Sequence, residues 1–311
     1  MARLFLIILT LSLFGMNCAG QKIASPKMEH IFLDKADSTK NCYTIIYPQK
    51  HPWQGYLLLV PGFGETAENV LFQTDLPKKL AQHGILTIIP TFQDGTFSFG
   101  VDSLSQQSFI NMLKDVNAKH KLNDLRLYVG GFSIGGSCVI KYAENSTIQP
   151  TAVFAIDPPL DFERFYHSAT RNIRLSKNTE VNQEDVYMIE RLEKETGGSP
   201  TTNLSAYYKL SPYSFSDTTQ TAIKKIIHIP LRIYTEPDIH WWLKERGTDF
   251  TKINATECSA MINELNRLGN QKAAFITTQN RGYRKPLNNR HPHSWSIVNN
   301  DELIAWLLKQ K

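Results

Sequence analysis

The sequence contains few cysteines, four in 311 residues: Cys18, Cys42, Cys138 and Cys258. None stands in a CxxC pair, and no group of His and Cys has the spacing of zinc ligands. The sequence therefore predicts neither a disulfide framework nor a metal site, and we expect no cofactor. An oxidising compartment would allow one bridge, between Cys42 and Cys258, but free thiols are the first expectation.

A strong charge of either sign is also missing. Lys and Arg number 34 against 29 Asp and Glu, a formal net charge of +5, and apart from a small cluster near the C-terminus the two signs are interleaved. Nucleic-acid-binding chains usually carry a basic patch or stripe, so we expect no nucleic-acid partner. The hydrophobic share of 41% is that of an ordinary globular protein and excludes a disordered or collagen-like chain.

No apolar run is long enough to suggest a membrane-spanning helix. The run at residues 4–14 is well short of the roughly 20 residues that cross a bilayer. It follows Arg3 and precedes the small residues Cys18-Ala19-Gly20, a pattern typical of a secretory signal peptide. We therefore predict a signal peptide at residues 1–20 and an exported chain that begins at Gln21. The alternative is a lipoprotein anchored at Cys18, which would be the one route to a membrane.

From residue 28 onward, apolar β-rich runs alternate with helical patterns. This alternation is typical of an α/β fold with a mostly parallel, doubly wound sheet that helices cover on both faces. Strands are expected at 31–33, 43–47, 56–60, 85–89, 125–129, 152–156, 231–234 and 273–277, and helices at 76–83, 105–120, 257–268 and 301–308. Residues 21–311 are expected to form one domain.

A polar stretch at residues 161–205 interrupts the alternation. It holds one expected helix, at 184–195, with Asn182 as its N-cap and Gly197-Gly198 after its end. We interpret the stretch as an insertion between two strands.

The strongest local motif is Gly131-Phe132-Ser133-Ile134-Gly135. A strand is expected directly before it and a helix directly after it. A serine on such a sharp turn projects its hydroxyl above the sheet, and flanking glycines avoid steric clashes there. The amino end of the following helix favours a developing negative charge. Ser133 is therefore the predicted nucleophile.

A serine nucleophile needs a base, and neutral imidazole is the usual one near pH 7. His293 lies after the last expected strand and before the last helix, at the sheet edge where Ser133 is expected. His291 is the alternative, although Pro292 restricts its backbone. The basic residues Arg281, Arg284, Lys285 and Arg290 flank this loop. They could favour an anionic substrate, but solvated loop charges are the simpler interpretation.

A carboxylate is expected to hold the imidazole in one tautomer and to stabilise its charged form. The strand at 231–234 ends in Thr235-Glu236-Pro237-Asp238 at the same edge, and Asp238 is the predicted acid. Glu236 is the first alternative, and Asp157, after the preceding strand, is the second.

The order Ser133, Asp238, His293 resembles the α/β-hydrolase superfamily, whose triad runs nucleophile, acid, histidine along the chain. Residues 57–64, Leu-Leu-Leu-Val-Pro-Gly-Phe-Gly, are similar to the strand and oxyanion loop of that superfamily, with Pro61 where His is common. The resemblance implies that the backbone N–H groups of Phe63 and Ile134 form the oxyanion hole. It also implies that residues 161–205 form a cap over the site.

By this resemblance the chain is expected to be an exported serine hydrolase that cleaves a carboxylic ester through an acyl-enzyme. Its partner would be a small-molecule ester or a short peptide. Two alternatives stay open: a peptidase acting on short peptides, and a non-catalytic binding protein with the same fold.

Overall fold

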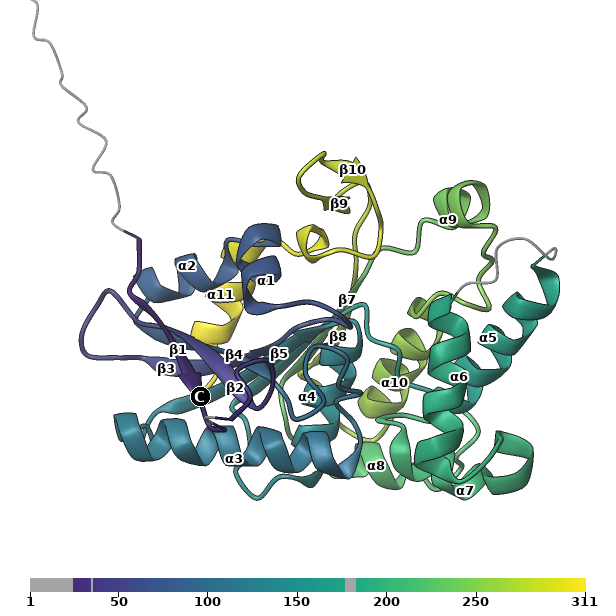
Figure 1. Cartoon of the computed structure of the whole chain (residues 1–311), viewed down its shortest axis with the longest axis horizontal. Coiled ribbons are helices and arrows are strands. Elements are labelled where there is room, and N and C mark those ends of the chain that lie inside the picture. Colours follow the sequence, from purple (N-terminus) through teal and green to yellow (C-terminus); the bar gives the residue numbers. More distant parts are fainter. Residues whose placement is uncertain (1–24, 35, 177–182) are drawn as a thin grey trace, which may run out of the picture.

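The computed structural model describes residues 25–34, 36–176 and 183–311, so the predicted signal peptide, Cys18 and Asn182 lie outside the described residues. Eight strands form one sheet in the order β1-β2-β4-β3-β5-β6-β7-β8 (Figure 1). These strands are β1 (Met28–Phe32), β2 (Cys42–Ile46), β3 (Gly55–Val60), β4 (Ile85–Thr91), β5 (Arg126–Phe132), β6 (Ala152–Ile156), β7 (Leu231–Thr235) and β8 (Ala273–Thr277).

The sheet is parallel from β4 through β8, and β2 and β1 extend it as antiparallel strands. Every residue of β3 and β6 is buried. Strands that are buried on both faces have continuous apolar sequences. This is why these two strands could be predicted from the sequence.

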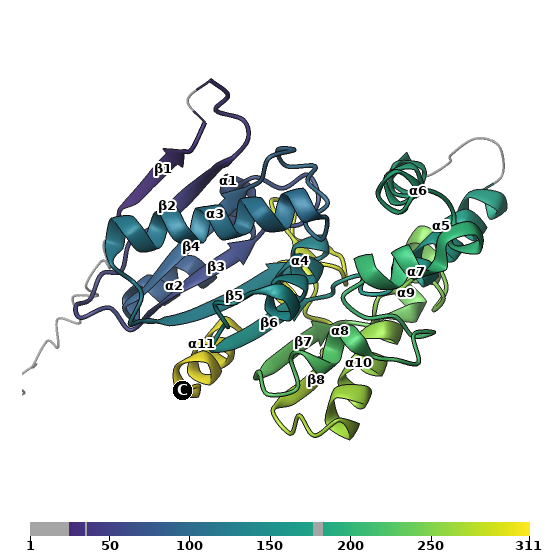
Figure 2. The ribbon, with the colours of Figure 1, turned by 90° about the horizontal axis from the view of Figure 1, so that it is seen from below.

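Helices cover both faces of the sheet (Figures 1 and 2). On one face pack α1 (Ala67–Gln73), α2 (Leu76–Gln82) and α11 (Asn300–Lys309). On the other face pack α3 (Ser103–His120), α4 (Ile134–Asn145), the short α8 (Thr221–Lys224) and α10 (Ala255–Arg267). The predicted doubly wound α/β fold is confirmed.

Between β6 and β7 the chain forms three further helices, α5 (Phe162–Leu175), α6 (Gln183–Thr196) and α7 (Pro200–Leu210). They lie beyond the carboxyl ends of the parallel strands (Figure 2). The sequence predicted α6 but not α5 or α7. Only Phe162, Ser168 and Ala169 of α5 are buried. Many of its other side chains are polar or basic, a composition that is also typical of a surface loop.

These helices are tied to the main body by charged side chains. Arg164 of α5 pairs with Glu257 of α10. Arg191 of α6 lies 3.0 Å from Asp94, in the loop after β4. Lys141 of α4 donates to the carbonyl oxygen of Lys209, at the end of α7, at 2.7 Å.

Later in the chain come α9 (Ile239–Arg246) and a hairpin of β9 (Tyr283–Arg284) and β10 (Asn289–Arg290). Cys42, Cys138 and Cys258 are all free thiols, so the alternative of a bridge between Cys42 and Cys258 does not occur. Within the part of the chain that the structure describes, no helix has the length and apolar character needed to cross a membrane.

Glu144 sits deep in the layer under the sheet, with its carboxylate 3.3 Å from the Lys141 ammonium group. Burial raises the pKa of Glu144 to about 7, although Lys141 acts in the opposite direction. The folded protein therefore holds a proton on this carboxyl more tightly than the unfolded chain does. The resulting contribution to stability is present at low pH and is lost as pH rises from about 4.5 to about 7.

Replacing Glu144 by Gln removes this titration. We expect the free energy of unfolding of Glu144→Gln, relative to the wild type, to improve as pH rises from about 4.5 to about 7 and then to level off. Because folded Glu144 is largely protonated over this range, exchanging its carboxyl group for an amide of similar shape adds only an offset that does not depend on pH. Urea unfolding followed by circular dichroism measures the difference, with the exposed Glu190→Gln as control. A difference that stays constant with pH would contradict the assignment.

Candidate functional site

Ser133 occupies the sharp turn between β5 and α4, with φ 53° and ψ −126°. A non-glycine residue in such a conformation stores roughly 1–3 kcal/mol of strain, which the surrounding structure must hold. Its N–H donates to the carbonyl oxygen of Ile156 at 2.8 Å, and its own carbonyl accepts from Gly136 at 2.8 Å. A Cβ on Gly131 would lie 2.3 Å from Gly135, and one on Gly135 would lie 2.3 Å from the carbonyl oxygen of Pro61. The turn therefore requires glycine at both positions.

His293 is held by Asp157. The Nδ1 atom of His293 lies 2.5 Å from Oδ2 of Asp157, and both side chains are largely buried. Asp157 directly follows β6 at φ 48°, and its N–H donates to the carbonyl oxygen of Tyr234 at 2.7 Å. With Nδ1 occupied by the carboxylate, Nε2 is the ring nitrogen left for other groups. Ser133, Asp157 and His293 all line the same cleft.

The prediction that Asp238 holds the imidazole is wrong. One carboxylate oxygen of Asp238 caps α9 by accepting from the N–H of Trp241 at 3.1 Å. The other lies 2.8 Å from Arg290. Asp238 therefore organises the start of α9 and contributes no contact to His293.

Glu236, the first alternative, is buried, and its contacts hold the loop that precedes His293. It accepts hydrogen bonds from the Thr278 hydroxyl at 2.8 Å and from the N–H of Arg281 at 2.9 Å, and it pairs with Arg290. Its carboxylate is thus fully used in fixing the segment that leads to His293. Asp157, the second alternative, is the one that the structure brings to the ring.

The reason lies in strand order. β6 pairs directly with β5, with Ile156 opposite Phe132, so the residue after β6 stands beside the turn that carries Ser133. β7 is one strand further away. The chain order of nucleophile, acid and histidine is still kept by Ser133, Asp157 and His293.

His291 also lines the cleft, but among the residues that the structure describes no carboxylate forms a hydrogen bond or ion pair with it. Its Nε2 lies 3.4 Å from the Arg246 guanidinium, and its Nδ1 is buried without a hydrogen-bond partner. Burial, then the neighbouring charges of Arg284, His293 and Arg246, lower the pKa of His291 to about 3, which keeps it neutral. The structure therefore gives His293 the partner that a general base needs and gives His291 none.

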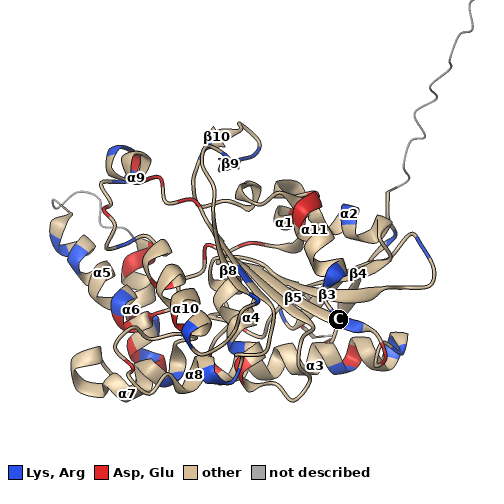
Figure 3. Cartoon of the chain, turned by 180° about the vertical axis from the view of Figure 1, so that it is seen from behind, with Lys and Arg blue, Asp and Glu red and all other residues tan. Residues whose placement is uncertain are grey.

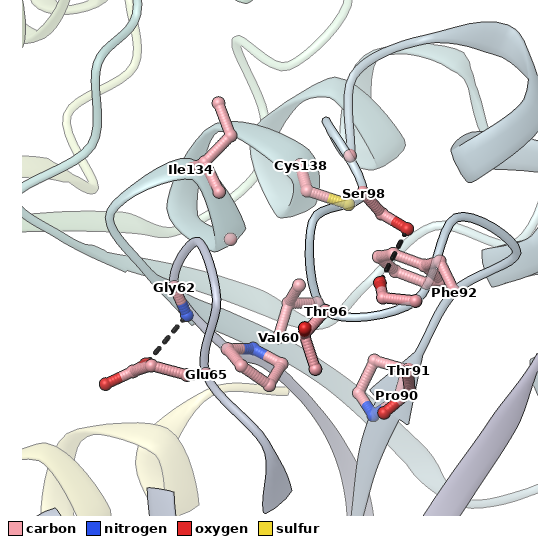
Figure 4. A pocket seen from close by; sticks show the side chains of 14 residues that line it. Val60, Gly62, Glu65, Pro90, Thr91, Phe92, Thr96, Ser98, Ile134 and Cys138 are labelled. Carbon is pink, nitrogen blue, oxygen red and sulfur yellow. Dashed lines mark hydrogen bonds between the residues drawn. The ribbon is translucent and has the colours of Figure 1, made fainter. Parts of the chain in front are cut away.

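The loop after β3 brings Phe63 to the cleft beside Ile134. The N–H of Gly62 donates to Glu65 at 2.8 Å, as Figure 4 shows, and the N–H of Gly64 donates to Thr96 at 2.9 Å. Among the described residues, none accepts from the N–H of Phe63, which lies between them. This leaves the donor free for a bound group, as an oxyanion hole requires.

Glu65 was missed by the sequence analysis, although it fixes this loop. Its carboxylate also accepts from the indole N–H of Trp295 at 3.1 Å, so it joins the loop after β3 to the segment that follows His293. Burial raises the pKa of Glu65, and the donors from Gly62 and Trp295 oppose that shift. Behind the loop, Val60, Gly62, Ile134 and Cys138 line a cavity of about 20 Å³, which has room for about one water molecule (Figure 4).

The cleft itself is about 720 Å³, a size that suits a small organic molecule. Its walls come from the nucleophile turn, from α5 and α6, from α9 and from the histidine loop. Part of the cleft is lined by apolar side chains, those of Phe63, Ile134, Phe165 and Met188. Another part is lined by Asp185 and Lys252, which form an ion pair. In the described ranges, no group of three or more His, Cys, Asp or Glu side chains could hold a metal ion.

No protein-family model matches this chain, and no curated protein matches its sequence. Solved structures do match it. FphF, a fluorophosphonate-binding serine hydrolase of Staphylococcus aureus, aligns with a TM-score of 0.57 at 11% identity, over 92% of this chain and 100% of its own. An S-formylglutathione hydrolase from Agrobacterium tumefaciens aligns with a TM-score of 0.54 at 13% identity, over 86% of this chain and 89% of its own.

The acylaminoacyl peptidase of Pyrococcus horikoshii aligns with a TM-score of 0.61 at 12% identity over 94% of this chain, which spans only 43% of that protein. At such low identity these likenesses concern the fold. The strand order, the turn at Ser133 and the three matches agree: this chain has the α/β-hydrolase fold.

Proposed function

We propose that the protein is a serine hydrolase that transfers the acyl group of a carboxylic ester to water, with Ser133 as nucleophile, His293 as base and Asp157 as acid. The observation that carries the proposal is the 2.5 Å contact of Asp157 with His293 in the cleft that Ser133 lines. A carboxylate on Nδ1 fixes the tautomer whose Nε2 can accept the serine proton. The hydrolase names of the structurally similar proteins support the same reaction class.

In the first half of the reaction, the Ser133 hydroxyl attacks the ester carbonyl carbon while His293 takes the hydroxyl proton. The carbonyl oxygen becomes an oxyanion, which the N–H groups of Phe63 and Ile134 stabilise; removing one such donor typically costs about 3–4 kcal/mol. The bond from carbon to the leaving oxygen then breaks. His293 gives its proton to that oxygen, which releases an alcohol and leaves an acyl-enzyme.

In the second half, water attacks the acyl carbonyl carbon and His293 takes a proton from it. The bond to Ser133 breaks, the proton returns to the serine oxygen, and the carboxylic acid leaves. Asp157 stabilises the imidazolium that forms in each half. Helices α5 and α6 serve as a cap, because Phe165 and Met188 bring apolar surface to the cleft.

A peptidase acting on short peptides is the second candidate, and the fold likeness to acylaminoacyl peptidases favours it. The ester assignment is preferred because FphF and the S-formylglutathione hydrolase, neither of which is named a peptidase, match over nearly their whole length, whereas this chain spans less than half of the peptidase chains. A panel of p-nitrophenyl esters and aminoacyl-p-nitroanilides distinguishes the two by relative kcat/KM.

The nucleophile is tested by Ser133→Ala. We expect the wild type to be labelled by a fluorophosphonate probe and to hydrolyse p-nitrophenyl esters, and the variant to do neither, because no other group replaces the attacking oxygen. Its circular dichroism should match that of the wild type. Full labelling of the variant would place the nucleophile elsewhere, and an unlabelled wild type would favour a non-catalytic binding protein.

The acid is tested by two matched substitutions. Asp157→Asn should lower kcat by about 10⁴-fold, because an amide on Nδ1 no longer holds the productive tautomer or balances the imidazolium. Asp238→Asn should stay within about tenfold of the wild type, since it loses only a helix cap and one contact with Arg290. Steady-state kinetics on one p-nitrophenyl ester compares them. The reverse order of effects would return the acid to Asp238.

Export remains a prediction from the apolar run at residues 4–14. Secretion of the full chain should yield a protein whose N-terminal residue is Gln21, because the small-residue site ends at Gly20. N-terminal sequencing and intact mass measure this. An acylated N-terminal Cys18 would instead support the lipoprotein alternative.

A further inference from the structure

Two arginines of the cleft differ from Lys252, the basic residue of the cleft that pairs with a carboxylate. Arg246, at the end of α9, and Arg284, in β9, both line the cleft with Ser133 and His293. Figure 3 shows basic residues on both elements. Both side chains are exposed, and within the described residues neither lies at ion-pair distance from a carboxylate.

Two of their basic neighbours, in contrast, are neutralised. Arg290 pairs with Glu236 and Asp238, and Lys252 pairs with Asp185. The two cleft arginines contact other groups: Arg246 lies 3.4 Å from Nε2 of His291, and Arg284 donates to the carbonyl oxygen of His293 at 2.7 Å. These contacts orient the guanidinium groups without forming an ion pair.

The cleft wall carries acidic as well as basic side chains, because Glu245 lines it next to Arg246. Partial desolvation lowers the pKa of Arg284, Glu65 opposes that shift, and the nearby charge of Arg246 adds to it. Glu184 lies in the same cleft and offsets part of the positive charge at Arg284. Two like charges that repel each other gain from a bound anion, and a planar carboxylate can accept the paired N–H donors of a guanidinium group.

The positive charges also have a definite position relative to the reaction. His293 must protonate the leaving oxygen, so the leaving group lies on the histidine side of the cleft. Arg284 contacts the backbone of His293, and the ring of His291, which Arg246 contacts, lies 6.5 Å from the ring of His293. Phe63 and Ile134 give the acyl end an apolar wall.

We infer that the cleft selects esters whose leaving group carries a carboxylate, and that Arg246 and Arg284 bind this carboxylate. The inference rests on the proposed function and names its substrate class. Arg246 and Arg284 are then specificity-determining residues, and His291 is the neutral spacer that orients Arg246.

Two acetate esters that differ only in charge test the inference: 4-acetoxybenzoate, whose leaving group is anionic, and its neutral methyl ester. We expect the wild type to have the higher kcat/KM for 4-acetoxybenzoate. Arg246→Gln should lower the ratio of the two kcat/KM values by about tenfold or more, the usual contribution of one charge-assisted hydrogen bond. Comparing ratios between variants cancels the difference in intrinsic reactivity of the two esters.

Arg281→Gln is the matched control, because it removes a positive charge from the same loop outside the cleft and should leave the ratio unchanged. Arg284→Gln should lower the ratio as Arg246→Gln does. A wild-type ratio of one or less, or equal ratios for Arg246→Gln and Arg281→Gln, would overturn the inference. Preference for phenyl hydrogen succinate over phenyl butyrate, with no preference for 4-acetoxybenzoate, would move the anion to the acyl side and also overturn it.

A binding measurement separates the inference from the proposed function. Calorimetry of Ser133→Ala should show that 4-acetoxybenzoate binds more tightly than its methyl ester, and that adding Arg246→Gln removes the difference. This result would support the anion site even if the wild type hydrolysed neither ester, an outcome that would reject the hydrolase proposal alone. Equal binding of both esters, with normal hydrolysis of p-nitrophenyl esters, would reject the inference alone.

Discussion

The geometry of the site depends on one close backbone contact, between Gly135 at the start of α4 and the end of β3. There is no space for a side chain, because a Cβ on Gly135 would lie 2.3 Å from the carbonyl oxygen of Pro61. The strands pair in register up to this point, with Val60 opposite Gly131. The contact therefore sets the distance between the turn that carries Ser133 and the loop that carries Phe63. A nucleophile and an oxyanion donor can act on one carbonyl group only if this distance is fixed.

Carboxylates at the carboxyl ends of the strands hold the other parts of the site in position, each by different contacts. Asp157 holds the imidazole, Glu236 fixes the loop that delivers it, and Asp238 starts α9 and pairs with Arg290. Glu65 joins the oxyanion loop to Trp295, two residues beyond His293. The histidine loop has little regular structure of its own, so these buried hydrogen bonds supply the rigidity that helices supply elsewhere. The position of His293 therefore depends on these acidic side chains more than on regular secondary structure.

This division of roles among the carboxylates explains which features of the site could be predicted from the sequence and which could not. The buried strands and the turn at Ser133 were predictable because each follows from a local pattern: an apolar run, or glycines at fixed spacing. The acid was not predictable in the same way. Asp157, Glu236 and Asp238 all follow strands at the same edge, and their residue types are equally suited to the role. The choice depended on β6 lying beside β5, a long-range fact. Helices α5 and α7 were missed because the polar stretch that contains them was interpreted as an insertion in which only α6 had recognisable start and stop signals.

The charge of the cleft could not be predicted from the sequence for the same reason. In the sequence, Arg284 and Arg290 belong to one basic cluster beside His293, and solvated loop charges were the simpler interpretation. In the structure, Arg290 is neutralised by two carboxylates, whereas Arg284 faces the cleft with Arg246, which comes from a different element 38 residues earlier in the chain. What matters for recognition is therefore the positive charge that remains after internal pairing, and only the fold determines that remainder. In this cleft the arginines without an ion pair lie on the histidine side, because Arg284 contacts the backbone of His293 and Arg246 contacts the ring of His291.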